Sequence, residues 1–170
     1  MGLLLRVGIA VVVIAAIAVG ASAALDRPSR SSTTTTVIHA PRESVWRLVV
    51  DFDAYPEWNP YMRSVQGRPE VGRTLEVHLE PPGAKAQDVS GSVTVFKPPR
   101  KLRWQSRLLA PGLRDLEYEV IVAPLGPNRA RVIQRARYEG LLAALVDAED
   151  TRAGLVQMAR ALKLRAESEA

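Results

Sequence analysis

The chain has 170 residues, of which 47% are hydrophobic and 24% are charged, and this is enough for one domain with a buried core. It contains no cysteine, which excludes disulfide bonds, thiol catalysis and cysteine-liganded zinc. The net charge is +5, but basic and acidic residues are interleaved, and no helix-turn-helix, RNP-like or arginine-rich motif occurs. We therefore expect no nucleic-acid partner.

Residues 1–25 predict a membrane anchor or a signal peptide. No charged residue lies between Val7 and Leu25, a run at the lower edge of the length that spans a bilayer. An A-x-A cleavage site ends at Ala23, so release by a signal peptidase is the alternative to a retained anchor. We favour the anchor, because the apolar run continues through that site. In both cases we expect the domain to lie outside the cytoplasm, with residues 26–32 as a short linker.

The next elements are predicted to be one strand and two short helices. Threonine, valine and isoleucine favour a strand over residues 33–39. A proline at the start and apolar side chains at helical spacing predict a helix over residues 41–50. A second short helix is expected within residues 53–61. Pro56 disfavours helical geometry at Tyr55, so we expect the chain to turn there.

Alternation of apolar and polar residues then predicts six strands, over residues 62–66, 74–80, 87–97, 101–108, 113–123 and 129–139. If the last two pair antiparallel, Glu117 opposes Arg135 or Arg137. Glu119 then lies beside Arg135. We interpret these arginines as cross-strand partners of the carboxylates, each pair contributing less than about 1 kcal/mol where solvent reaches it.

The last part of the chain predicts one long helix over residues 141–167, with a kink or break at residues 147–151, where the apolar stripe is interrupted. A strongly twisted antiparallel sheet has a concave face, and a single helix that covers this face does not fill the concave space by itself. The order of elements therefore predicts a cavity between the sheet and the C-terminal helix.

Two motifs carry a family resemblance. Residues 38–46 read Ile-x-Ala-Pro-x-x-x-Val-Trp, and residues 51–60 read Asp-Phe-Asp-Ala-Tyr-Pro-Glu-Trp-Asn-Pro. With the order of elements, they resemble the SRPBCC or START-like superfamily, in particular its polyketide cyclase/dehydrase branch. The resemblance implies an α+β helix-grip fold over residues 33–167, in which a curved antiparallel sheet of about seven strands wraps a long C-terminal helix.

The resemblance also implies a ligand cavity between the sheet and that helix. We expect no cofactor, and no metal, because Asp51, Asp53 and Glu57 have no histidine nearby and no Asp-x-Asp-x-Asp-Gly loop follows them. Apolar walls with a few hydroxyl and amide groups suit a hydrophobic small molecule or a lipid. The residues that we expect to line the cavity are Trp46, Phe52, Tyr55, Trp58, Tyr61, Trp104, Tyr118, Gln134, Tyr138, Leu155, Met158 and Leu162, with Val77, Val120 and Ala136 beside them.

The main functional hypothesis is a non-catalytic carrier or binder of such a ligand at the cell envelope. The alternative is a cyclase or aromatase, for which Tyr118, Gln134 and Tyr138 are the inward polar side chains. The catalytic residues are not identified by the sequence, because His39 closes a strand at its edge and His78 alternates to the outer face. An interaction module that uses the outer sheet face is a third hypothesis.

Overall fold

The computed structural model describes residues 29–108 and 112–170. The expected anchor or signal peptide, residues 1–25, lies outside the described residues. Within the described part, no helix combines the length and the hydropathy needed to cross a bilayer. The elements are β1 (Ser29–Ile38), α2 (Arg42–Val50), the 3-10 turn η1 (Phe52–Ala54), α3 (Tyr55–Trp58), β2 (Met62–Gly67), β3 (Thr74–Leu79), β4 (Gln87–Lys97), β5 (Lys101–Leu108), β6 (Arg114–Gly126), β7 (Arg129–Glu139), the 3-10 turn η2 (Ala143–Leu145) and α4 (Ala148–Ser168).

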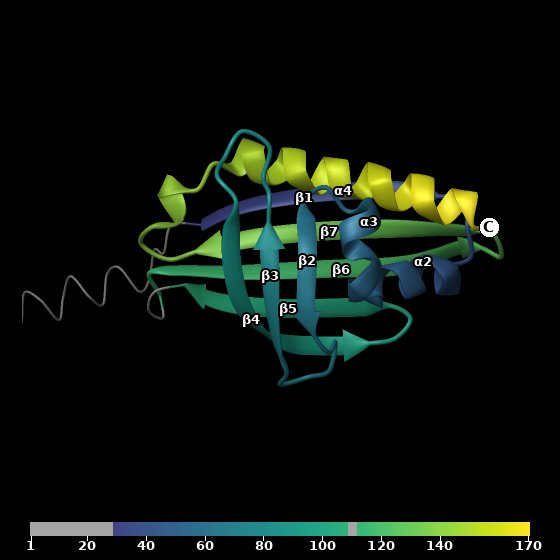
Figure 1. Ribbon diagram of the computed structural model, residues 1–170, viewed down its shortest axis with the longest axis horizontal. Coiled ribbons are helices and arrows are strands. Elements are labelled where there is room, and N and C mark those ends of the chain that lie inside the picture. The colour runs from purple at the N-terminus through teal and green to yellow at the C-terminus, as the bar shows by residue number, and fades with distance from the viewer. Residues whose placement is uncertain (1–28, 109–111) are drawn as a thin grey trace, which may run out of the picture.

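All seven strands form one antiparallel sheet in the order β1-β7-β6-β5-β4-β3-β2. The sheet curls, so that β2, β3 and β4 cross the direction of the other strands (Figure 1). Helix α4 lies along β1 and β7, and α2 and α3 lie beside the C-terminal half of α4 (Figure 1). This arrangement confirms the expected α+β helix-grip architecture.

Strand β1 begins earlier than the sequence indicates. Ser29 pairs with Glu139 at the end of β7, and the pairing continues to Ile38 opposite Ala130. Residues 29–32 therefore belong to the sheet, and their expected role as a linker is wrong. Their polar side chains are compatible with a strand because β1 is an edge strand, and the backbone pairing to β7 does not depend on side-chain type.

The predicted turn at Tyr55 is also wrong. Tyr55 has helical backbone angles, φ −56° and ψ −42°, and Pro56 lies in the first turn of α3. A proline is tolerated in a first turn because its missing N–H would have no partner inside the helix. The chain turns instead at Asn59, whose Oδ1 accepts from the backbone N–H groups of Tyr61 at 3.1 Å and Met62 at 3.0 Å.

The C-terminal helix starts later than expected. Residues 141–147 hold only the short turn η2, and α4 begins at Ala148. Asp147 is its N-cap, and the carboxylate accepts from the backbone N–H of Glu149 at 2.8 Å. The predicted break thus lies before the helix: the backbone is extended at Asp147, with ψ 111°, and the capping carboxylate satisfies amides that the first turn leaves free.

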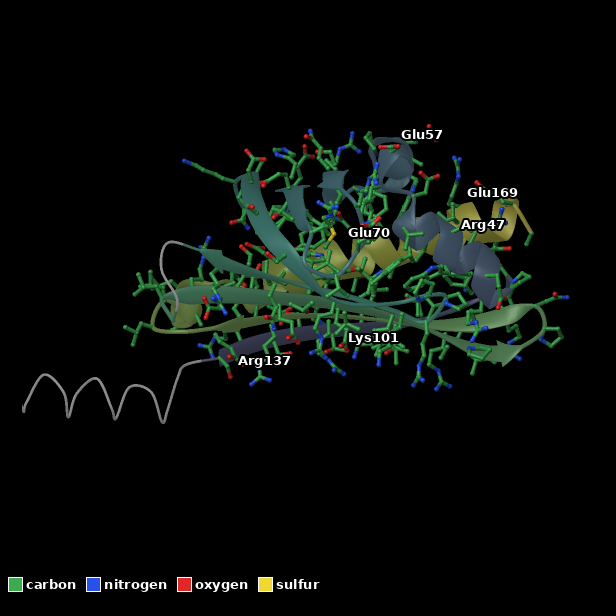
Figure 2. All side chains as sticks on the ribbon, turned by 90° about the horizontal axis from the view of Figure 1, so that it is seen from below. Arg47, Glu57, Glu70, Lys101, Arg137 and Glu169 are labelled. Atoms are coloured by element: carbon green, nitrogen blue, oxygen red, sulfur yellow. The ribbon has the colours of Figure 1, made fainter. Side chains whose placement is uncertain are left out.

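The predicted pairing of β6 with β7 is confirmed, with Glu117 opposite Arg137 and Glu119 opposite Arg135. Figure 2 shows the labelled Lys101 and Arg137 on the outer face of the sheet. Glu119 differs from the other acidic residues of this face, because it is only 3% exposed. Lys101 and Arg103 of β5 both form ion pairs with its carboxylate.

Candidate functional site

The structure brings all twelve predicted cavity residues into one interior, between the concave face of the sheet and the helices. Ten of them belong to a single buried apolar cluster, and Trp58 packs against that cluster from a partly buried position. Gln134 is the remaining member and is 0% exposed. Contact of these side chains with a ligand stays a prediction, since burial in a core and a place in a binding site are both compatible with this position.

The aromatic residues of the η1 and α3 segment close one end of the interior. The rings of Phe52 and Tyr55 meet edge to face at 5.4 Å, and those of Tyr55 and Trp58 at 5.1 Å. The Tyr55 hydroxyl donates to the carbonyl oxygen of Val49 at 2.7 Å. Burial raises the pKa of Tyr55, so its hydroxyl stays protonated and serves as a structural donor.

Trp104, Tyr118 and Met158 meet at the centre of the interior. The Trp104 and Tyr118 rings are 5.7 Å apart, and the Tyr118 hydroxyl lies 3.8 Å from the Met158 sulfur. Gly91 on β4 makes room for the indole, because a Cβ at that position would lie 2.8 Å from Cε3 of Trp104. Sequence reasoning missed Gly91, although a glycine inside an alternating strand is a signal of close approach.

Gln134 is the most unusual polar group of this interior. Its register neighbours are Thr34 on β1 and Val120 on β6, and no residue that the structure describes forms a hydrogen bond with its Nε2 or its Oε1. A buried amide without partners loses the hydrogen bonds that water gives it in the unfolded chain. The side chain therefore offers one donor and one acceptor to a molecule that enters the interior.

A second polar group lies toward the N-terminal end of α4. Burial raises the pKa of Tyr138, whereas the Thr151 hydroxyl, the Arg114 guanidinium and the Tyr61 hydroxyl act in the opposite direction. Burial also raises the pKa of Tyr61. Sequence reasoning missed Arg114 and Thr151. The alternation of β6 could have identified Arg114, since it shares its face with Tyr118.

The described residues also form four pockets on outer surfaces. One of about 220 Å³ lies at the β5, β6 and β7 ends, beside Gln105, Glu117 and Arg137. The predicted cavity is not one of these four, because none of its expected residues lines any of them. Instead, the contact of Tyr118 with Met158 crosses the centre of the interior. A guest in this interior would have to displace that contact.

Neither histidine reaches the interior. Nδ1 of His39 lies 2.9 Å from the Glu167 carboxylate, and Nδ1 of His78 lies 2.6 Å from that of Asp88 on the outer face. Both positions agree with the sequence-based expectation. Among the described residues, no group of three or more histidine or acidic side chains is arranged to hold a metal ion.

Comparison with known proteins identifies the family. Residues 29–167 match the family described as "Polyketide cyclase / dehydrase and lipid transport". The chain belongs to this family. Its fold is that of the START-like superfamily, as the sequence motifs indicated, and membership in the family supports a domain that binds hydrophobic molecules.

Solved structures share the fold of this family member at low sequence identity. A START superfamily protein from Mycobacterium smegmatis aligns with a TM-score of 0.65 and 21% identity over 83% of this chain and 99% of that one. The Zhui aromatase/cyclase from a Streptomyces species aligns with a TM-score of 0.63 and 19% identity over 84% and 96% of the two chains. A ginseng major latex-like protein reaches 0.66 with 14% identity over 81% and 97%.

One curated protein from Penicillium oxalicum is similar in sequence. The "Oxopyrrolidines biosynthesis cluster protein O" is 36% identical over 85 residues, which cover 41% of this chain. The match spans 42% of the length of that relative, well under half of it.

Proposed function

We propose that this domain binds a hydrophobic small molecule or lipid between the concave face of the sheet and α4, without changing it chemically. The observation that carries the proposal is Gln134, whose buried amide has no hydrogen-bond partner among the described residues. A carbonyl or hydroxyl group of a ligand would supply the missing partner.

The walls around Gln134 suit an apolar guest. Leu155, Met158 and Leu162 of α4 are each at most 1% exposed and face the sheet. Met158 meets Tyr118 across the centre, and an unbranched thioether side chain can adopt other rotamers at low cost. Rotation of Met158 would break this contact and make room for a ligand at the centre of the interior.

Replacing Gln134 by leucine tests this proposal. We expect Gln134→Leu to raise the Kd of an apolar ligand with a carbonyl group about tenfold, the effect of one lost hydrogen bond. The melting temperature should stay the same or rise, because an apolar side chain of similar size replaces an unpaired amide. The measurement is titration of the purified full chain with the carbonyl-containing dye Nile red.

The matched control is Gln105→Leu, which removes a glutamine of the outer face that donates to Glu117 at 2.7 Å. This variant should bind Nile red as the wild type does. Native mass spectrometry of the full chain and mass analysis of an organic extract should reveal a co-purified hydrophobic molecule. A protein that carries no such molecule and does not bind Nile red would rule out the binding function.

Cyclase-like catalysis in the same interior is a second candidate. The observation that favours it is the buried hydroxyl of Tyr118, whose pKa burial raises well above the ordinary value. A hydroxyl that stays protonated can donate to the oxygen of a reacting carbonyl. Turnover of a poly-β-keto substrate that is lost in Tyr118→Phe would favour this candidate over simple binding.

We also propose that the domain is tethered to a membrane and that the N-terminal end of β1 faces the bilayer. Leu141 and Leu145 are 54% and 80% exposed in the segment between β7 and α4. Ser29 pairs with Glu139 just before this segment, so the uncharged run that ends at Leu25 joins the domain beside both leucines. Exposed apolar side chains next to such a run are a typical membrane-contact feature.

The mass and partitioning of the protein made in cells test this location. For a retained anchor, we expect the full-length mass in the membrane fraction, resistant to carbonate washing. A soluble product that lacks residues 1–23 would identify a cleaved signal peptide. Full-length protein in the cytosolic fraction would contradict both forms of the proposal.

A further inference from the structure

We propose that the ligand of this interior is an amphipathic organic acid, whose anionic group is held by Arg114 at the end of the interior nearest the start of α4. The apolar body of the acid would then lie along β6 and β7 toward Gln134. This inference rests on the proposed binding function and adds the charge of the ligand to it.

Arg114 faces the interior because of its place in the strand register. It pairs with Leu108 on β5. Because side chains alternate between the two faces of a strand, Arg114 lies on the same inner face of β6 as Leu116 and Tyr118. Arg30 of β1 lies opposite Tyr138 on the same face of the sheet but is exposed, whereas Arg114 is half-buried. The other inward positions of the described strands β4, β5, β6 and β7 carry no charge. Leu116 pairs with Tyr138, so Arg114 is the next inward position of β6 beyond that tyrosine, in agreement with its lowering effect on the pKa of the Tyr138 hydroxyl.

The guanidinium of Arg114 is not neutralised by the described part of the chain. Its Nε is buried without a hydrogen-bond partner, and none of the ion pairs between described residues includes it. By contrast, Arg103, Arg135 and Arg137 on the outer face all pair with carboxylates. A partly buried cation without a counter-charge is costly, so this position favours an anion from outside the chain.

Two acidic residues, one beside Arg114 in the sequence and one at the start of α4, already accept hydrogen bonds from backbone amides. Asp115 alternates to the outer face, where its carboxylate accepts from the backbone N–H of Gly112 at 3.2 Å. Asp147 accepts from the backbone N–H of Glu149 at the start of α4. A carboxylate of a ligand would therefore not compete with a side chain that already binds Arg114, and it matches the fork of donors on a guanidinium.

Hydroxyl groups complete this end of the interior. Tyr138 and Tyr61 are 5% and 2% exposed, and burial keeps both hydroxyls protonated, so that they can donate to an anionic oxygen. Tyr61 is held in place by α4, because a Cβ on Gly154 would lie 2.6 Å from Cε2 of the Tyr61 ring. The donors are thus fixed before a ligand arrives, which lowers the entropic cost of binding.

The distance to Gln134 sets a minimum length for the ligand. Gln134 lies four residues from Tyr138 along β7, which is about 13 Å in a strand. On the neighbouring strand β6, Leu116 lies opposite Tyr138 and Val120 opposite Gln134. Tyr118 lies between them, and all three side chains are buried. A medium-chain or long-chain acid spans this distance, whereas a small metabolite does not.

Titration of the full chain with dodecanoic acid and with dodecanol tests the inference, because the two probes share the apolar chain and differ in the charged group. We expect the wild type to bind the acid at least tenfold more tightly than the alcohol. Arg114→Met should remove this preference by weakening the acid alone, and Arg114→Lys should retain part of it, since an ammonium keeps the charge without the bidentate geometry. Arg131→Met, which removes an exposed arginine of the outer face, should change neither affinity.

The outcomes separate this inference from the binding function. Equal affinity of the wild type for acid and alcohol would overturn the inference and leave the binding function intact. The inference would also be overturned if Arg114→Met lost affinity for the acid and for the alcohol equally, while circular dichroism showed the wild-type fold. If neither probe binds and no hydrophobic molecule co-purifies with the wild type, the binding function fails, and the inference fails with it.

Discussion

Gly140→Ala is expected to lower the free energy of unfolding by about 3–5 kcal/mol, the largest loss among the single substitutions considered. Gly140 has φ +113°, a region that residues with a side chain rarely adopt. A Cβ there would also lie 2.6 Å from the carbonyl oxygen of Gly112 and 2.7 Å from that of Leu113. These are backbone atoms, so the clash is relieved only by moving the chain. Chemical denaturation of the two proteins measures the loss.

The reason for the close approach is a pair of backbone hydrogen bonds. The N–H groups of Leu141 and Leu142 donate to the carbonyls of Gly112 and Leu113 at 3.2 and 2.8 Å, and they join the segment before α4 to the start of β6. Gly126→Ala is the matched control, because Gly126 has φ +145° but nothing within 4 Å of its Cβ position. We expect the control to lose only about 1–2 kcal/mol. Equal losses would show that the clash contributes nothing.

Glu119→Ala is expected to lower the free energy of unfolding by about 2 kcal/mol at neutral pH. The substitution would leave Lys101, Arg103 and Arg135 facing one another without the buried carboxylate that now binds all three. Their side chains are partly exposed, so water offsets part of the repulsion. Glu117→Ala is the control on the same face. Its carboxylate is 28% exposed and lies 3.5 Å from Arg103, so we expect a loss under about 1 kcal/mol.

The contribution of Glu119 should depend on pH. Burial raises the pKa of this carboxyl, but hydrogen bonds from Lys101 and Arg103 outweigh burial and hold the pKa below its ordinary value of 4.5. A group with a lowered pKa stabilises the fold fully above its unfolded-state pKa, and it loses that effect as the pH falls through the folded-state pKa. The difference between the wild type and Glu119→Ala should therefore be full at neutral pH and shrink below pH 4.5. A difference that grows in acid would contradict this account.

Elements with a local cause were predicted well from the sequence. Helix α2 follows from Pro41 and from apolar side chains at helical spacing, and the register of β6 with β7 follows from a short turn between two alternating strands. The start of α4 was missed because apolar side chains continue at helical spacing through residues 141–146. Only the bonds from backbone amides to Asp147 distinguish a capped start from a continued helix.

The burial of the candidate residues was predicted from the sequence, their hydrogen bonding was not, and their contact with a ligand stays a prediction. Alternation correctly placed Tyr118, Gln134 and Tyr138 on the inner face, but alternation gives no information on hydrogen-bond partners. The same limit applies to Glu119, which alternation assigns to the outer face. Glu119 is nevertheless buried, because Lys101 and Arg103 on β5 cover it. This cover depends on the register of the sheet, in which Arg103 lies opposite Glu119.

By itself, the sequence of this protein determined the type of nearly every element and the face on which each side chain lies, because both depend on residues a few positions apart. Only the tertiary structure decided that Gln134 and the Arg114 Nε are buried without partners while Glu119 has three. Hydrogen bonding and neutralisation of charge depend on distances between side chains of different strands and helices, and those distances are set when the sheet curls around α4.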